Sequence, residues 1–228
     1  MEDYQNQDKS YKRVIEYIKD RIKLGEITIG QKIPSERELS ETLGISRNSV
    51  REAIRTLDFM GIISSQQGAG NYMTGNLQSN LVESMSMLFL LDQIDYKQIS
   101  ELRRGLELEA LNIAIDKITQ EEIEEFQQIL DKLENCSEDD NIILDKKLHY
   151  GIASVSGNLL IISILNALSE VMDQFIADLR RDILVSESRE KLHIAHRDIV
   201  ESLRTGDKEL GTHAIDMHFN AIDERLKK

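Results

Sequence analysis

Residues 34–57 have the pattern of two short helices joined by a tight turn, which strongly limits the fold of the surrounding chain. Ser35 and Glu38 are spaced as a capping box that begins the first helix. Gly44 can adopt the left-handed conformation that ends it, and Ser46 is placed to cap the second. The segment therefore predicts a helix-turn-helix.

Two arginines lie near the start of the second predicted helix. Arg47 and Arg51 are four residues apart, so they share one face of that helix. In helix-turn-helix docking this end approaches base edges and phosphates in the major groove. The free backbone amides and partial positive charge there also favour a phosphate. The alternative is a protein-docking module whose arginines are merely solvated, and the spacing favours DNA over it.

A β-hairpin is predicted to follow over residues 61–73, where two short apolar segments flank a glycine-rich turn. The turn residues are Gln67, Gly68, Ala69 and Gly70. Upstream, a first helix is predicted to end at Leu24 and Gly25, because apolar residues repeat at helical spacing at Tyr11, Val14, Ile15, Ile18 and Ile22. Three helices followed by a hairpin make a winged helix.

This pattern resembles the winged-helix domain of the GntR family of bacterial transcription regulators. The resemblance rests on residues 22–25, 30–39, 43–47, 50–53 and 61–63, in that order. It implies that DNA is contacted by the positions matching Arg37, Ser46, Arg47, Arg51 and Gly68. The wing residue before that glycine is often basic in the family but is Gln67 here, so we expect weaker contact between the wing and the minor groove.

Composition favours a helical protein of two domains. The 228 residues include one proline and no tryptophan, and 30% are charged. The single cysteine, Cys136, cannot form an internal disulfide, the N-terminus is polar and acidic, and the apolar stretches are too short to cross a membrane. We therefore expect a cytoplasmic protein without a membrane partner.

Charge is divided unevenly along the chain. Residues 1–75 contain 11 Lys+Arg and 11 Asp+Glu, so the net charge of −13 falls entirely on residues 76–228. That second part would repel DNA at close range. DNA binding should therefore depend on a local basic patch and weaken steeply with salt.

Everything after residue 75 is predicted to be helical. Apolar positions recur at helical spacing over residues 77–92, 95–116, 120–136, 140–156, 159–182, 188–204 and 208–226. We therefore predict a mainly α protein with a winged helix-turn-helix domain over 1–75 and an antiparallel bundle of six or seven helices over 76–228.

Four side chains in this second part have the composition of a metal site. Asp145 and His149 are four apart on one predicted helix, and His196 and His218 lie on the last two. One carboxylate and three imidazoles suit a divalent transition metal, with zinc as the first candidate and nickel or manganese as alternatives. His193 can compete with His196 as a ligand, and inward-facing histidines can also be ordinary core residues with hydrogen bonds.

The second part is also similar to the FCD effector domain of the FadR subfamily. The matching segments are residues 101–107, 145–149, 156–160, 196–200, 206–207 and His218. The resemblance implies that Asp145, His149, His196 and His218 hold a metal and that a small carboxylate effector binds against it. It also implies that Arg103 pairs with this carboxylate, although Arg103 can instead form a salt bridge with Glu107.

We therefore expect a DNA-binding transcription regulator rather than an enzyme. A homodimer would bind a palindromic operator in double-stranded DNA, and we expect it to act as a repressor controlled by the carboxylate. One alternative is a purely structural metal with an effector that is not a carboxylate. The other is a metal-dependent enzyme fused to a DNA-binding domain, which the absence of Gly-x-Ser-x-Gly and His-Glu-x-x-His motifs disfavours.

Overall fold

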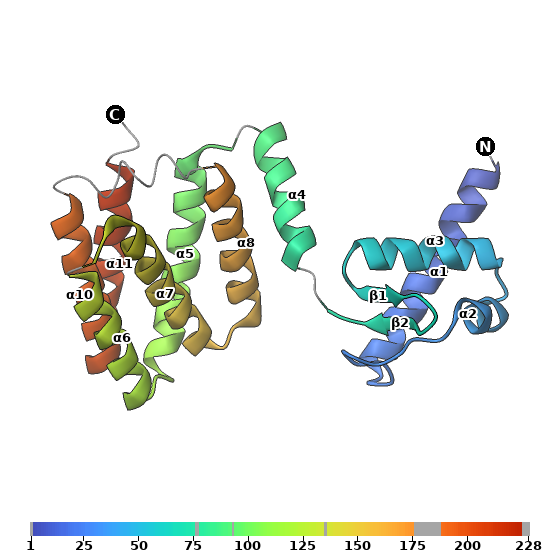
Figure 1. Ribbon diagram of the computed structural model, residues 1–228, viewed down its shortest axis with the longest axis horizontal. Coiled ribbons are helices and arrows are strands. Elements are labelled where there is room, and N and C mark those ends of the chain that lie inside the picture. The colour runs from blue at the N-terminus through green and yellow to red at the C-terminus, as the bar shows by residue number, and fades with distance from the viewer. Residues whose placement is uncertain (1, 76–77, 93, 135, 176–187, 225–228) are drawn as a thin grey trace. The chain divides into compact units, whose positions relative to one another are not determined.

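The computed structural model describes residues 2–75, 78–92, 94–134, 136–175 and 188–224 (Figure 1). The chain divides into two compact units, Met1–Glu83 and Ser84–Lys228, and each has its own hydrophobic core. The division falls within helix α4 (Gln78–Leu91). The domain boundary expected after residue 75 precedes this helix and stays a prediction.

Before α4, the described part of the first unit contains three helices and a two-stranded hairpin. Their order is α1 (Glu2–Lys23), α2 (Glu36–Leu43), α3 (Arg47–Phe59), β1 (Ile63–Gln66) and β2 (Gly70–Met73). The predicted capping box is confirmed, because Ser35 accepts a hydrogen bond from the Glu38 amide and the Glu38 carboxylate accepts one from the Ser35 amide. Gly44 ends α2 at φ 61°, and Ser46 caps α3.

Apolar side chains from all these elements form the core of the first unit. The buried residues are Val14, Ile18, Ile27, Ile33, Leu39, Val50, Ala53, Ile54, Leu57, Ile63 and Met73. The predicted apolar stripe of α3 faces this core, which leaves the side chains of Arg47 and Arg51 on the exposed surface of the helix. Helix α3 is thus packed against the core by one face and exposed on the other.

The hairpin is fastened to the segment that leads into α2. Strands β1 and β2 pair antiparallel, with Ile63 opposite Met73 and Gln66 opposite Gly70. The outer edge of β2 then bonds to residues 30–33, since the amide of Ile33 donates to the carbonyl of Asn71 over 2.9 Å. This additional pairing places the wing tip near the start of α2.

The second unit is a helical bundle. The helices after α4 are α5 (Tyr96–Ile115), α6 (Gln120–Leu133), α7 (Glu138–Ser156), α8 (Leu159–Phe175), α10 (Ser188–Thr205) and α11 (Lys208–Asp223). The predicted mainly α fold with a winged helix and a helical bundle is confirmed, with helix ends shifted by a few residues. Residues 176–182 and 225–226, which the sequence also predicted to be helical, lie outside the described residues.

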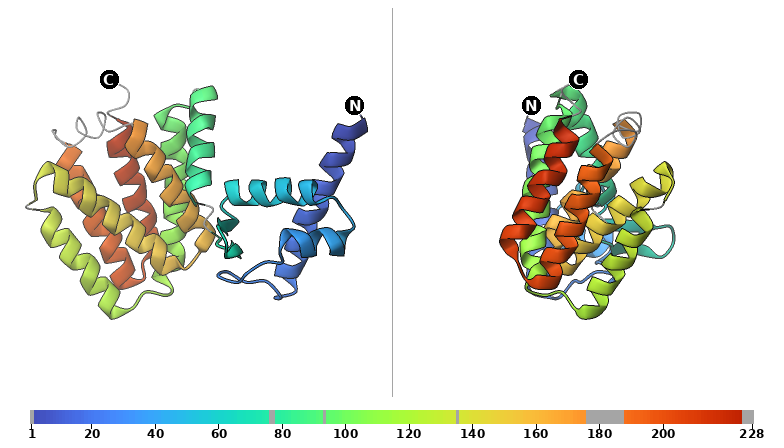
Figure 2. Two further views of the ribbon diagram at one scale, coloured as in Figure 1. Left: turned by 45° about the vertical axis from the view of Figure 1, so that its right-hand side comes forward. Right: turned by 90° about the vertical axis from the view of Figure 1, so that its left-hand side faces the viewer.

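The bundle core is formed mainly by five of these helices. Helix α10 packs along α11, and α5 contacts both α7 and α11 (Figures 1 and 2). The largest buried cluster consists of Leu111, Ala114, Phe126, Ile129, Leu130, Leu133, Leu148, Ile152, Ile199, Val200, Leu203, Ala214, Ile215 and Phe219. In the described ranges, every helix is too short or too polar to cross a membrane.

Two helical glycines of the second unit test this packing. A Cβ at Gly151 would lie 2.6 Å from Cε1 of the buried Phe126, whereas a Cβ at Gly105 would meet nothing within 4 Å. We expect Gly151→Ala to lower the free energy of unfolding by about 1–3 kcal/mol, because the ring must move. Gly105→Ala should raise it by about 0.4–1 kcal/mol, because alanine restricts the unfolded chain. Urea unfolding measures both, and a Gly151→Ala variant as stable as the wild type would contradict this packing.

Candidate DNA-binding surface and metal centre

A shallow groove lies between the start of α2, the exposed face of α3 and the wing. We call it the basic groove, and its charged lining residues are Lys32, Glu36, Arg37, Arg47 and Arg51. Four cations against one carboxylate make the groove positive in a region whose total charge is balanced. Such a patch supplies the local attraction for phosphate that the overall acidity of the chain would otherwise oppose.

The predicted DNA-contacting residues gather at this groove. Arg37, Arg47, Arg51 and Gly68 line it, while the side chain of Ser46 caps α3 at the helix start. Gly68 has φ 79°, and the position of a Cβ there is open space. A backbone without a side chain at the wing tip can approach another backbone closely. The structure thus brings these residues together, and their contact with DNA stays a prediction.

Arg51 is held by a carboxylate of the neighbouring helix. Its Nη2 and Nε donate to Oε2 of Glu36 over 3.1 and 3.2 Å, and this contact raises the pKa of the Arg51 guanidinium. The pair is solvent-exposed, so its own contribution to stability is small. A phosphate or a guanine edge would have to compete with Glu36 for the same donors.

The four predicted metal-ligating residues converge from three helices of the second unit. Asp145 and His149 lie on α7, His196 on α10 and His218 on α11. One ligand atom from each can be chosen so that all four lie within 4.8 Å of one another. The three histidines are buried, and Asp145 is partly exposed. His193, the competing candidate, is not part of this cluster among the described residues.

Short polar distances connect three members of the cluster. Nε2 of His196 lies 3.0 Å from Oδ1 of Asp145, and Nε2 of His149 lies 3.4 Å from Nε2 of His196. Burial disfavours the charged form of Asp145, but the hydrogen bond from His196 and the charge of His149 outweigh this and lower the pKa of the carboxyl. An ionised carboxylate beside three imidazoles is a donor set suited to a cation.

His218, the fourth member of the cluster, differs from the others in its lack of hydrogen bonds. Both of its ring nitrogens are buried, and neither has a hydrogen-bond partner among the described residues. Burial, followed by the proximity of His149 and His196, places the pKa of His218 well below its ordinary value, so the ring is neutral. Unpartnered buried polar atoms are costly in a core. A cation bound among the four residues would provide a partner for one of the two nitrogens.

A fifth polar side chain, that of Glu107, contacts the cluster through His149. Glu107 of α5 places Oε2 2.7 Å from Nδ1 of His149, while its Oε1 accepts from Nη2 and Nε of Arg103 over 2.7 and 3.0 Å. Burial would raise the pKa of Glu107, but the charges of Arg103 and His149 lower it to about 2. The salt bridge between Arg103 and Glu107, one of the two alternatives weighed for Arg103, is therefore present.

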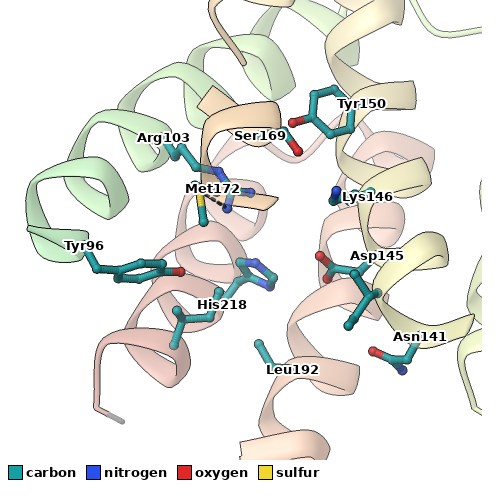
Figure 3. A pocket seen from close by; sticks show the side chains of 12 residues that line it. Tyr96, Arg103, Asn141, Asp145, Lys146, Tyr150, Ser169, Met172, Leu192 and His218 are labelled. Atoms are coloured by element: carbon teal, nitrogen blue, oxygen red, sulfur yellow. Dashed lines mark hydrogen bonds between the residues drawn. The ribbon is translucent and has the colours of Figure 1, made fainter. Parts of the chain in front are cut away.

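Arg103 nevertheless also borders a cavity of about 70 Å³ next to the cluster (Figure 3). The cavity lining includes Tyr96, Arg103, Asn141, Asp145, Lys146, Tyr150, Ser169, Met172 and His218. The carboxylate of Asp145, the ring of His218 and two cationic side chains thus line a single small cavity. The sequence did not predict that Lys146 and Tyr96 line this cavity, or that Glu107 contacts His149. Helical spacing does not show which neighbouring helix a side chain reaches.

Comparison with known proteins identifies the family. Residues 10–73 match the family model described as bacterial regulatory proteins, gntR family, and residues 98–221 match the FCD domain. The chain belongs to the GntR family of regulators with an FCD domain. It is therefore a DNA-binding transcription regulator and not an enzyme, as the sequence predicted.

Individual relatives span almost the whole chain. The HTH-type transcriptional regulator LutR of Bacillus subtilis (strain 168) is 27% identical over 90% of this chain and 95% of its own. The putative L-lactate dehydrogenase operon regulatory protein of Escherichia coli (strain K12) is 26% identical over 95% of this chain and 88% of its own length. The HTH-type transcriptional repressor NanR of Enterobacter sp. (strain 638) is 26% identical over 92% of this chain and 82% of its own length.

A solved structure shares the fold. Streptococcus agalactiae GntR superimposes with a TM-score of 0.63 at 21% sequence identity, covering 97% of this chain and all of its own. At this identity the likeness concerns the fold alone, and the site residues rest on the geometry described above.

Arg51→Ala should weaken binding to the specific operator by about 1–3 kcal/mol, because a bidentate arginine–guanine contact contributes that much discrimination. Fluorescence anisotropy against a duplex selected from random DNA measures the loss. Arg55→Ala is the control, since Arg55 is exposed on the same helix, pairs with Glu52 and lies outside the basic groove. Full sequence-specific affinity in the Arg51→Ala protein would remove Arg51 from the contact set.

Proposed function

We propose that this regulator is a repressor whose DNA affinity is set by a small carboxylate bound at a divalent transition metal. The metal, with zinc first and nickel or manganese as alternatives, would be held by Asp145, His149, His196 and His218. One observation carries the proposal: four donor side chains from three helices lie close together, and two of them, Asp145 and His218, line a small cavity that two cationic side chains also line.

The donor set fits a metal better than it fits an ordinary hydrogen-bonded core. A core cluster would satisfy its own polar atoms, yet both nitrogens of His218 lack a partner within the described residues. Three imidazoles and one carboxylate are ligands common at zinc and related metals. When bound, the metal would supply a Lewis-acidic centre that accepts carboxylate oxygens of the effector.

The cavity matches a small anion in charge and in size. Arg103 and Lys146 line it, and an arginine fork can pair with a carboxylate. Its volume of about 70 Å³ is roughly five times the 10–15 Å³ that one water needs. That space suits a molecule of a few heavy atoms, such as a short hydroxy acid. The name of the E. coli relative, which refers to an L-lactate dehydrogenase operon, agrees with this size class.

The regulatory half of the proposal follows from symmetry and from the relatives. Two copies of the chain would present their recognition helices to two half-sites of a palindrome, as a twofold axis requires. NanR relatives are named repressors, which supports repression here. We place the protein in the cytoplasm, where bacterial DNA lies. A coupling free energy of about 1–3 kcal/mol is typical between two allosteric sites, and we expect a value of this size between effector and DNA binding.

A structural metal is the competing function. Four protein ligands can complete a tetrahedral site, and a closed site of this kind stabilises a fold without binding an effector. The placement of Asp145 at the cavity and the cationic lining favour a sensing role instead. The two functions differ in whether an added carboxylate stabilises the metal-loaded protein.

Asp145→Ala should abolish stoichiometric zinc binding while the protein still folds. The change removes the only carboxylate of the four-residue cluster, and the side chain is 31% exposed, so no closely packed group is lost. Zinc content after dialysis and circular dichroism measure the two properties. Asp131→Ala, at an exposed position on α6, is the control. Unchanged zinc content in the Asp145→Ala protein would refute this site.

A small carboxylate should stabilise the zinc-loaded protein and leave the chelated protein unchanged. We would record thermal unfolding of both forms with L-lactate, glycolate, pyruvate and malate. At a hundredfold excess over the dissociation constant, binding adds about 2.7 kcal/mol of stability. Stabilisation by a carboxylate of the loaded form alone supports the sensor.

Thermal unfolding of two variants with and without the carboxylate tests whether Arg103 binds it. Arg103→Met should lose the stabilisation, whereas Lys97→Met, an exposed change on the same helix, should keep it. If chelation lowers the unfolding temperature but no carboxylate raises it, the metal is structural and the sensing role is withdrawn.

A further inference from the structure

We propose that Glu107 is a positioning residue that orients the metal ligand His149 and links it to the cavity arginine Arg103. This inference rests on the proposed metal site and adds a residue outside the four ligands. It also provides a path by which anion binding in the cavity and metal binding can influence each other.

The two carboxylate oxygens of Glu107 lie next to two different partners, and Oε1 is the one engaged in hydrogen bonds. Oε2 lies 2.7 Å from Nδ1 of His149, and Oε1 accepts both hydrogen bonds from Arg103. With Nδ1 directed to Glu107, the remaining nitrogen Nε2 of His149 faces Asp145 at 3.7 Å and His196 at 3.4 Å. Glu107 thus sets which ring nitrogen of His149 points into the cluster, as outer carboxylates do for metal-bound histidines.

The side chains of Glu107, His149 and Arg103 are all largely buried, so their contacts matter more than those of a surface ion pair. The side chains of Glu107 and His149 are 5% and 4% exposed, and that of Arg103 is 13% exposed. A carboxylate in such a place must keep its partners, since an uncompensated buried charge is strongly destabilising. The positions of the Arg103 guanidinium and the His149 ring are therefore both tied to one fixed group on α5.

Arg103 connects this group to the cavity. Its Nε and Nη2 are directed to Glu107, whereas Nη1 lies 3.7 Å from Sδ of Met172, a cavity-lining residue (Figure 3). An anion that pairs with Arg103 would draw charge away from the Arg103–Glu107 contact. Glu107 would then interact more strongly with His149 and make it a better donor to the metal. Anion and metal binding should consequently reinforce each other.

The first test is the zinc affinity of the full chain, measured by competition with a fluorescent chelator at fixed pH. Glu107→Gln should weaken zinc binding by about 10–100-fold, the loss typical of an outer partner of a metal-bound histidine. Glu109→Gln makes the same chemical change at an exposed position on α5 and should leave zinc affinity unchanged. A Glu107→Gln protein that binds zinc as tightly as the wild type overturns the proposal.

The second test asks whether Arg103 acts through Glu107. Arg103→Met should raise zinc affinity by about fivefold in the wild-type background, at the lower end of typical couplings between sites. The same change in the Glu107→Gln background should have little effect, because the connecting carboxylate is gone. Equal effects in both backgrounds would mean that Arg103 acts on the metal directly, and the link through Glu107 would be wrong.

Folding of the variants is controlled by circular dichroism of the zinc-free proteins. If Glu107→Gln alone unfolds because Arg103 is left buried and unpaired, the double variant is compared with Arg103→Met. In that background the loss of zinc affinity should be about 50–500-fold, because Arg103→Met has already raised the affinity about fivefold. Absence of zinc, nickel and manganese binding in the wild type would be a different failure. It would overturn the proposed metal site itself, and the role of Glu107 with it.

Discussion

The burial of charged and polar groups inside the second bundle is the constraint on which the proposed site depends. Glu107, His149, His196 and His218 lie among apolar side chains of α5, α7, α10 and α11, so each needs a partner that water cannot supply. Arg103 and Asp145 provide part of that compensation. Both nitrogens of His218 and Oε2 of Glu107 remain without a hydrogen bond among the described residues. A metal would provide a partner for one nitrogen of His218 and so add to this compensation.

The first unit carries a locally positive surface although the whole chain is acidic. The chain carries a net charge of −13, yet the basic groove has four cationic side chains within one small area. Pairing of residues 30–33 with β2 brings Lys32 and the wing beside the start of α2, and the core face of α3 leaves Arg47 and Arg51 exposed. If DNA binds at this groove, as predicted, the attraction comes from local arrangement rather than from total charge.

Arg51 and Arg103 illustrate how differently the two units hold an arginine. Arg51 pairs with Glu36 at an exposed surface, where the contact is weak and a phosphate can replace it. Arg103 pairs with Glu107 in a nearly closed environment, where neither charge can be left alone. An incoming anion at Arg103 must therefore be shared with Glu107, which makes this arginine suited to transmitting a binding event.

The sequence by itself determined the winged helix and the helical character of the second unit, because both depend on local signals. The Ser35–Glu38 capping box, the left-handed Gly44 and the apolar stripe of α3 are set by spacings of three or four residues. Residue types and helical spacing also offered the four candidate ligands, and the family resemblance strengthened that prediction. Only the tertiary structure decided that Asp145, His196 and His218 meet, and that Glu107 reaches His149 as well as Arg103. Helical periodicity gives the face of a side chain but not its neighbouring helix, because that choice is made by packing between distant segments.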